Sequence, residues 1–463
     1  MPAGCYYTHC YYSGTSENNV TNQGDIDSGS VQRVTVPRSG HVISRANISS
    51  SALKVLYRLK EAGFQAYLVG GGVRDLLLGR EPKDFDVGTD ATPEQVRQLF
   101  RNCRLIGRRF RLAHVRFGRE IIEVATFRAR HDEDTDADRD SARSDEGRIL
   151  RDNVYGTIED DVWRRDFTVN ALYYDIRDFS VIDYVGGLHD LESGTLRVIG
   201  EPEQRFREDP VRMLRAVRFA AKLGFRIDPA SETVIQELGY LLEDIPSARL
   251  FDEVLKLFLG GCAVATYELL RHYDLFRILF PMTEESLGRE EEGFPHTFVL
   301  RALENTDQRL AEGKPVTPAF LYAALLWEPM RLRMQELLED GMSPLEAAQL
   351  AGNQITAEQV AVTSLPKRFS FPMREIWTLQ PRLERRRGKA PQRTLQHPRF
   401  RAAYDFLLLR AEVGEAPEEL AAWWTAFQNR DAAEQEPVAA AAPAKKKRRR
   451  RRRKRKPAAA SDD

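Results

Sequence analysis

Two aspartates separated by one residue, Asp84 and Asp86, are the side chains of this sequence best suited to chemistry. In a strand, alternate side chains share a face, so both carboxylates point the same way while Phe85 and Val87 point into the core. Paired like charges repel unless a cation lies between them, and oxygen ligands of this kind suit Mg²⁺. The alternative for an isolated pair is a solvated acidic edge. The neighbouring motifs decide between these two interpretations.

A glycine-rich turn that includes Gly70 and Gly71 begins fourteen residues before Asp84. It follows a predicted strand and opens a predicted helix. Glycine lets backbone N–H groups approach a phosphate, a helix N-terminus favours negative charge, and Arg74 supplies a forked donor. A glycine turn, an arginine and paired carboxylates in this order predict a site for a metal-bound nucleoside triphosphate.

A second polar cluster begins at Arg164 and Arg165 and continues through Asp166 to Asn170. Two-metal phosphoryl transfer commonly uses a third carboxylate to hold the ion that activates the attacking hydroxyl. Asp166 is one candidate for this role, and Glu123 in the centre of a predicted strand is the other. The alternative for Asp166 is a salt bridge to its arginine neighbours.

A third cluster combines Asp209 with three arginines at helical spacing, Arg212, Arg215 and Arg218. We expect Asp209 to cap a helix that Pro210 begins, with the arginines along one face. A solvated helix face is the alternative. Acidic and guanidinium groups together can also match the donor and acceptor edge of a base.

Hydrophobic periodicity indicates which elements position these clusters. An amphipathic helix over 51–63 precedes a strand over 64–69, and strands over 112–117 and 120–127 are joined at hairpin spacing. From about residue 201 helix signals replace strand signals, so the fold class is α+β, a small mixed head followed by helical domains. We expect a disordered leader over 1–42 and a catalytic head over 43–200, which includes a mobile acidic loop at 131–148. A helical neck over 201–262 and a helical body with an arginine-rich C-terminal domain over 263–430 should follow. The chain should end in a disordered polybasic tail over 431–463.

The charge balance conceals two oppositely charged parts. The 463 residues include 69 Lys and Arg against 69 Asp and Glu, but twelve of the basic residues form the run 445–456. The rest is therefore acidic, with 57 basic against 69 acidic residues. Four cysteines without a CxxC spacing favour a reducing compartment, and no apolar stretch reaches the roughly 18 residues that span a bilayer. We expect a cytoplasmic protein.

The motifs at 70–75, 84–86, 164–171, 183–187 and 208–220 together resemble class II nucleotidyltransferases, the superfamily of CCA-adding enzymes and bacterial poly(A) polymerases. The resemblance implies a polymerase-β-like head and helical neck, body and tail domains. It implies that Asp84 and Asp86 are catalytic and bind two Mg²⁺ ions, which Mn²⁺ can replace, with Asp166 as the third acid. It also implies nucleotide contacts from Gly70, Gly71, Arg74, Arg165, Asp209, Arg212, Arg215 and Arg218.

Two further segments resemble the poly(A) polymerase branch: the basic and hydrophobic stretch 105–115 and the arginine-rich stretch 382–401. They imply template-independent addition of AMP from ATP to RNA 3′ ends. RNA contacts are expected at Arg108, Arg109, Arg385, Arg386, Arg387, Lys389 and Arg393. The resemblance also implies a monomer associated with RNA degradation machinery or an RNA chaperone. The alternatives are a CCA-adding tRNA nucleotidyltransferase and a catalytically silent RNA-binding protein.

Overall fold

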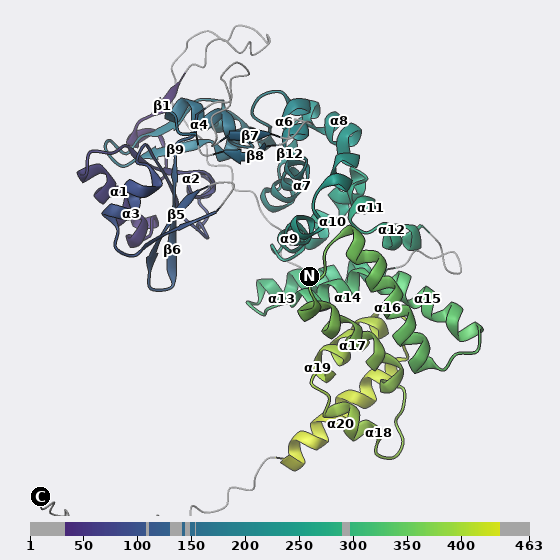
Figure 1. Ribbon diagram of the computed structural model, residues 1–463. Helices are drawn as coiled ribbons and strands as arrows, with labels where there is room; N and C mark the ends of the chain where they lie inside the picture. The colour runs from purple at the N-terminus through teal and green to yellow at the C-terminus, as the bar shows by residue number, and fades with distance from the viewer. Residues whose placement is uncertain are drawn as a thin grey trace, which may run out of the picture. The chain divides into compact units, whose positions relative to one another are not determined.

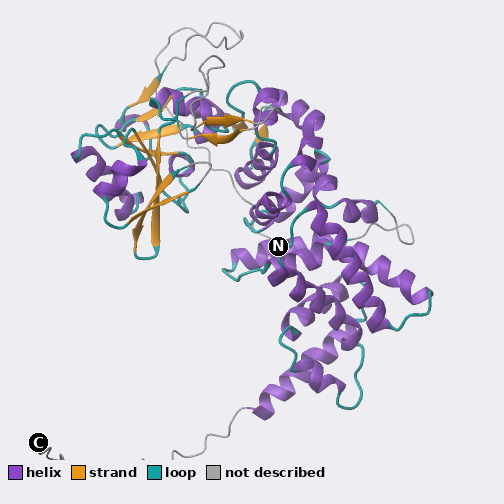
Figure 2. Cartoon of the chain, viewed as in Figure 1, coloured by secondary structure: helices purple, strands orange, loops and turns teal. Residues whose placement is uncertain are grey.

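The chain divides into two compact units in a computed structural model that describes residues 33–107, 111–129, 141–143, 149–152, 154–288 and 297–435. The first unit comprises Met1–Asp209 with Arg226–Ser231, and the second comprises Pro210–Phe225 with Glu232–Asp463. Every described strand belongs to the first unit, and the described elements of the second are helical (Figures 1 and 2). The α+β class is therefore confirmed.

An eight-stranded mixed sheet forms the frame of the first unit, in the order β1-β10-β9-β2-β3-β6-β5-β4. All neighbouring strands are antiparallel except β3 and β6, which are parallel. Two short ladders, β7 with β8 and β11 with β12, lie outside it. The strands are β1 (Val34–Val36), β2 (Ala66–Val69), β3 (Asp86–Thr89), β4 (Cys103–Ile106), β5 (Leu112–Phe117), β6 (Glu120–Thr126), β7 (Ser141–Arg143), β8 (Ile149–Asp152), β9 (Leu172–Asp175), β10 (Val181–Asp183), β11 (Thr195–Leu196) and β12 (Arg226–Ile227).

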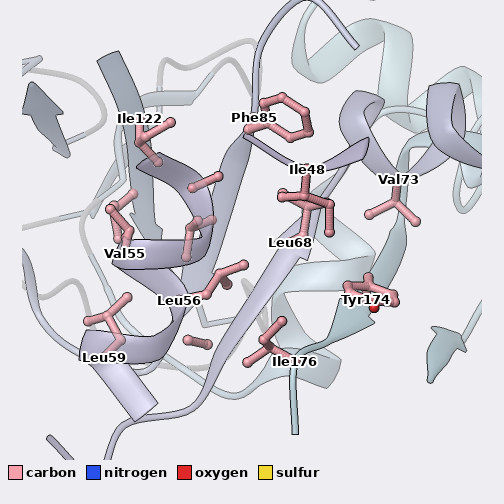
Figure 3. Close-up of a cluster of buried hydrophobic side chains, with 14 of the residues drawn as sticks. Ile48, Val55, Leu56, Leu59, Leu68, Val73, Phe85, Ile122, Tyr174 and Ile176 are labelled. Carbon is pink, nitrogen blue, oxygen red and sulfur yellow. The ribbon is translucent and has the colours of Figure 1, made fainter. Parts of the chain in front are cut away.

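Helix α1 (Ser50–Glu61) covers one face of this sheet, as its apolar periodicity predicts. The Ser49 side chain caps it by accepting a hydrogen bond from the backbone N–H of Ala52. Its buried residues pack with side chains of the central strands and with Phe85 (Figure 3). Burying one leucine such as Leu56 contributes roughly 2 kcal/mol, so this face anchors the strands that carry the site.

Strand β2 is buried on both faces, which explains its uninterrupted apolar sequence. Leu68 joins the core beneath α1, whereas Tyr67 and Val69 join a second core on the opposite face. Ile158 and Val162 of helix α4 (Ile158–Arg164) belong to that second core. Because β2 pairs with β3, the segment that follows β2 is held beside the start of β3.

The remaining helices of the first unit are short, and those of the second unit pack around buried aromatic residues. Trp377 and Trp424 are fully buried and donate their indole N–H groups to backbone carbonyls, at 3.0 and 2.8 Å. The helices are α2 (Gly71–Leu77), α3 (Pro93–Leu99), α5 (Gly187–Ser193), α6 (Pro202–Glu208), α7 (Val211–Leu223), α8 (Pro229–Leu238), α9 (Ser247–Phe258), α10 (Ala263–His272), α11 (Leu275–Leu279), α12 (Pro281–Leu287), α13 (Phe298–Ala311), α14 (Pro318–Leu325), α15 (Trp327–Glu339), α16 (Pro344–Val362), α17 (Lys367–Leu383), α18 (Ala390–Leu395), α19 (Phe400–Glu412) and α20 (Glu418–Gln435), with 3-10 turns η1 (Arg38–Gly40), η2 (Arg45–Asn47), η3 (Thr168–Asn170) and η4 (Gly239–Asp244).

Two predicted boundaries are wrong. The leader does not extend to residue 42, because β1 pairs with β10 at the edge of the sheet and Nε2 of His41 donates a hydrogen bond to the carbonyl of Phe179 at 2.9 Å. The expected loop at 131–148 includes β7, which pairs with β8, while its other residues lie outside the described part. Neither strand could be predicted from periodicity, since both are only three residues long.

The expected capping role of Asp209 also differs in the structure. Asp209 has an extended backbone and ends α6, and Pro210, already helical, occupies the N-cap position of α7. Within the described residues, no helix is long and apolar enough to cross a membrane.

Candidate active site

The two aspartates lie where the chain enters β3. Phe85 is buried in the core beneath α1, which turns Asp84 and Asp86 away from that core (Figure 3). β3 begins at Asp86, and Asp84 is an exposed residue just before it. The predicted alternation of side chains is therefore present, although only the second aspartate belongs to the strand.

Glu123 is the partner of Asp86 in the parallel pairing of β3 with β6. Residues paired in this way share a face, so both carboxylates lie on the same side of adjacent strands. On the other side of Glu123, its carboxylate oxygen lies 3.1 Å from Nε2 of His114 in β5. The structure thus places Glu123, one of the two predicted third carboxylates, beside Asp86.

The electrostatics of Asp86 reflect this crowding. Burial raises the pKa of Asp86 to about 6, and the carboxylates of Glu123 and Asp84 act in the same direction, whereas Arg165 opposes them. The ionised form of Asp86 therefore lacks sufficient positive charge from the protein itself. A bound divalent cation would supply that charge, and three carboxylates are hard oxygen ligands of the type Mg²⁺ prefers.

Within the described residues, no three side chains of His, Cys, Asp or Glu converge into a preformed metal cage. This agrees with the ordinary behaviour of Mg²⁺, which uses one or two protein carboxylates together with substrate phosphates and water. The donor set therefore fits Mg²⁺ bound jointly with a nucleotide.

The glycine turn packs directly against the aspartate segment. Gly70 has φ +70° and ψ −138°, a conformation that other residues rarely adopt. A Cβ at Gly70 would lie 3.4 Å from Nη1 of Arg165, and one at Gly72 would lie 3.4 Å from the backbone oxygen of Asp84. The turn therefore lies next to Arg165 and to the backbone of Asp84, and it is the positive φ of Gly70 that requires glycine.

Arg74 is not an open phosphate ligand in this structure. Its side chain is only 3% exposed, and it donates to Asp75 at 2.7 and 2.9 Å and to the amide oxygen of Asn170. These contacts tie the helix after the glycine turn to η3. A direct contact between Arg74 and a triphosphate requires them to open.

Asn170 connects Arg74 to Asp166. Its amide nitrogen donates to the Asp166 carboxylate at 3.2 Å, and the Phe167 N–H donates to the same oxygen at 2.9 Å. Asp166 is thus held by its own loop. Glu123 and Asp84, by contrast, are the carboxylates whose charges raise the pKa of Asp86.

Arg165 is fixed by partners that the sequence did not single out. It donates to the Asp161 carboxylate at 2.9 and 3.1 Å and to the Tyr173 hydroxyl at 2.8 Å. Tyr173 in turn donates to Asp161 at 2.9 Å. The i,i+4 spacing of Asp161 and Arg165 on α4 was a usable signal, whereas Tyr173 comes from β9 and carried none.

The predicted base-reading arginines lie on α7, in the second unit. Arg212 is buried, and Arg215 and Arg218 are half-buried with their guanidinium groups 5.5 and 4.7 Å from the ring centre of Phe219. Asp209 belongs to the first unit. The helical spacing of the three arginines is present, and their contacts with a nucleotide stay a prediction.

The predicted RNA-binding residues at the C-terminal end form an exposed basic segment. The segment links α17 to α18, and among the described residues none of its members forms an ion pair. Its members are Arg385, Arg386, Arg387, Lys389 and Arg393. Arg108 and Arg109 lie outside the described residues.

Comparisons with known proteins agree with this geometry. Residues 66–197 match the "Poly A polymerase head domain", residues 224–287 the "Probable RNA and SrmB- binding site of polymerase A", and residues 340–457 the "Polymerase A arginine-rich C-terminus". Poly(A) polymerase I of Salmonella typhi is 53% identical over 87% of each chain. A CCA-adding enzyme of Lactobacillus helveticus is 38% identical over 45% of this chain and 50% of its own.

Among solved structures, the CCA-adding enzyme of Bacillus stearothermophilus in complex with CTP is similar, with 27% identity, coverage of 82% of both chains and a TM-score of 0.53. The mixed sheet with paired carboxylates beside a glycine turn, together with these matches, defines the protein as a nucleotidyltransferase. Within that class, the chain belongs to the poly(A) polymerase family.

Proposed function

We propose that the protein adds AMP from ATP to the 3′ ends of RNA without a template and releases pyrophosphate. The observation that carries this proposal is the set of three carboxylates, Asp84, Asp86 and Glu123, beside a glycine turn in a poly(A) polymerase head. Crowded negative charge of this kind attracts divalent cations, and a metal-bound nucleoside triphosphate brings them.

Asp84 and Asp86 are the proposed ligands of two Mg²⁺ ions. When bound, such ions supply Lewis-acid chemistry to the attacking hydroxyl and the departing pyrophosphate. The chain itself holds both carboxylates on one side of β3 and anchors them through Phe85. It also places Arg165 near the site, where its positive charge favours phosphate.

We assign the third carboxylate to Glu123, with Asp166 as the alternative. Support comes from the direct pairing of Glu123 with Asp86 and from its effect on the pKa of Asp86. Asp166 accepts two hydrogen bonds from its own loop, which suits a residue that shapes the loop next to Arg165.

The proposed triphosphate contacts are Gly70, Gly71 and Arg165. Arg74 supports them by holding the turn against Asn170, unless its contacts open on binding. Asp209, Arg212, Arg215 and Arg218 are proposed to select adenine. The exposed segment 385–393 is proposed to hold RNA phosphates without regard to sequence.

CCA addition is the second candidate, because CCA-adding enzymes share the head. Polyadenylation is favoured because the poly(A) polymerase relative matches at 53% over 87% of the chain, whereas the CCA-adding relative covers 45%. Cytoplasmic location, a monomeric state and association with RNA degradation machinery or an RNA chaperone stay predictions.

Asp84→Asn and Asp86→Asn test the site directly. Each variant should lose AMP incorporation almost completely, because the carboxylate charge that holds the metal is gone. Binding of a labelled oligoribonucleotide, measured by fluorescence anisotropy, should stay near the wild-type level. Substantial synthesis by either variant would refute the assignment of the pair.

A further inference from the structure

A pocket of about 400 Å³ in the second unit is lined mostly by residues outside the motifs described above, with Pro398, Arg399 and Arg401 coming from the arginine-rich stretch 382–401. Four helices line it: α13, α14, α17 and α19, which pack against one another (Figure 1). All of its lining residues fall within the continuously described stretch 297–435. The side chains that line the pocket are therefore all known.

The floor of the pocket is apolar and aromatic. Phe320 and Phe369 contribute half-buried rings, and Ile376 lies between flanking prolines. Both rings are held from behind, because Phe320 packs edge-on against Phe406 with ring centres 5.9 Å apart, and Phe369 stacks on Phe251 at 5.9 Å. Rigid rings of this kind are the surfaces on which nucleic-acid bases stack.

The rim of the pocket is basic. Its charged lining residues are Arg309, Arg368, Arg399, Arg401 and Asp405. Arg401 pairs with Asp405 at 3.0 Å, and Arg399 pairs with Glu375 at 3.3 Å. Within the described part of the chain, Arg309 and Arg368 form no ion pair, although the carboxylate of Glu312 lies close enough to Arg309 to interact with its charge. A phosphate would compensate the positive charges of both arginines.

Arg368 and Pro372 add features that suit a planar base. The guanidinium carbon of Arg368 lies 4.8 Å from the ring centre of Phe369, and guanidinium groups stack on bases as aromatic rings do. Pro372 lies inside α17 and lacks the N–H that would bond the Arg368 carbonyl. That carbonyl is therefore not used by the regular helical bond.

We propose that this pocket binds one nucleotide of the RNA strand upstream of the reacting 3′ end, with its base on Phe320 and its phosphate at Arg309 and Arg368. The proposal rests on the proposed function in that RNA is the substrate. The basic segment 385–393 begins at the other end of α17, roughly 25 Å from Arg368 at 1.5 Å per residue. An RNA strand along this helix would contact both, which favours RNA over a lone nucleotide.

The test compares two double variants that remove the same charge. Arg309→Ala with Arg368→Ala changes the pocket, whereas Arg301→Ala with Arg333→Ala changes half-buried, ion-paired arginines on α13 and α15 that do not line it. Affinity for a labelled single-stranded oligoadenylate is measured by anisotropy at several salt concentrations, after thermal melting shows that both variants are folded.

The pocket variant should bind at least tenfold more weakly than the control variant. Its plot of log affinity against log salt should be flatter by about 1.4, the value for two lost phosphate contacts to a single strand. Phe320→Leu should reduce the preference for oligoadenylate over an abasic strand of equal length, because stacking is lost.

Equal weakening by both double variants, or no weakening by the pocket variant, would overturn the proposal. The proposal would also be overturned if a polyglutamate peptide bound with the same dependence on Arg309 and Arg368, since this would indicate an acidic protein partner. Tight binding of AMP alone, with no effect of the variants on RNA binding, would indicate a free nucleotide instead. These binding results do not depend on catalysis. A wild-type protein that fails to incorporate AMP would refute the proposed function and leave this comparison intact.

Discussion

At the scale of single residues, the site is defined by carboxylates that repel one another. Asp86 is the centre of the group, because its pKa is raised to about 6 by burial, by Glu123 and by Asp84. The sequence alone identifies Asp84 and Asp86, because they are separated by one residue and so can share a face of a strand. The neighbourhood of Glu123 depends on the register of β3 with β6, which no local pattern reveals.

Glu123→Gln should therefore impair catalysis. It keeps the size of the side chain and removes the charge beside Asp86, so we expect kcat to fall by about 100-fold, the usual scale for losing one electrostatic contact in an active site. Single-turnover AMP incorporation measures the effect. Glu120→Gln, at the start of the same strand, is the matched control and should leave kcat within a factor of two or so of wild type, well below that scale. An equal loss in both variants, or a loss seen only in Asp166→Asn, would restore Asp166 as the third acid.

At the scale of elements, the glycines place one motif against another. A Cβ at Gly187, in the first turn of α5, would lie 2.3 Å from the carbonyl oxygen of Thr168 in η3. That turn ends at Asn170, which links Arg74 and Asp166. Gly187 is thus explained by close packing of α5 on the loop that carries Asp166, whereas Gly186 is explained by its φ of +80°.

Gly187→Ala should push η3 away from α5. We expect a loss of about 1 to 3 kcal/mol in the free energy of unfolding, typical of overpacking, and a lower rate of AMP incorporation. Gly63→Ala is the control, because Gly63 has φ +88° but open space around its Cα. It should cost about 1 kcal/mol through backbone strain alone and leave the rate unchanged. If Gly187→Ala unfolds no more easily than Gly63→Ala, the packing explanation is wrong.

A second element-scale prediction concerns an acidic pair at the start of α15, in which Glu328 is fully buried and Glu415 is half-buried. Burial and the neighbouring Glu328 carboxylate raise the pKa of Glu415 from 4.5 to about 7, against a hydrogen bond from Trp327 and the charge of Arg410. The folded chain therefore keeps a proton that the unfolded chain releases above pH 4.5. The free energy of unfolding should therefore fall as the pH rises from about 4.5 to about 7. Above about pH 7 Glu415 is ionised in both states, so its contribution should not change further.

Glu415→Gln removes this penalty while keeping an oxygen for the Trp327 indole. The free energy of unfolding of the variant minus that of wild type should be larger at pH 8 than at pH 5, by roughly 1 to 3 kcal/mol. Urea unfolding at four pH values measures it. Glu419→Gln, exposed at the start of α20, should show the wild-type pH dependence. A parallel pH dependence in Glu415→Gln and wild type would show that Glu415 does not titrate as described.

Elements were easier to predict from sequence than their pairing. The helix over 51–63 and the strands at 66–69, 112–117 and 120–126 follow their apolar periodicity, and the structure confirms them. β1 was missed because three residues on a sheet edge are stabilised by pairing with β10 rather than by a pattern of their own. Arg74 was predicted to be an open ligand because its partner Asn170 lies 96 residues away in sequence.

At the scale of the whole molecule, the zero net charge does not describe how the charges are distributed. The carboxylates of the candidate active site lie in the first unit, whereas basic residues line the pocket of the second unit and form the exposed segment 385–393. Under the proposed function, this division would separate phosphoryl transfer from the holding of RNA.

The most direct test of the central claim is an incorporation assay with each single nucleoside triphosphate and Mg²⁺. The substrates are a tRNA that lacks its terminal CCA and an unrelated oligoribonucleotide. The proposed function predicts long oligoadenylate tails on both RNAs with ATP and little product with CTP, GTP or UTP. Addition of C and then A to the tRNA alone, or no incorporation of any nucleotide, would contradict it.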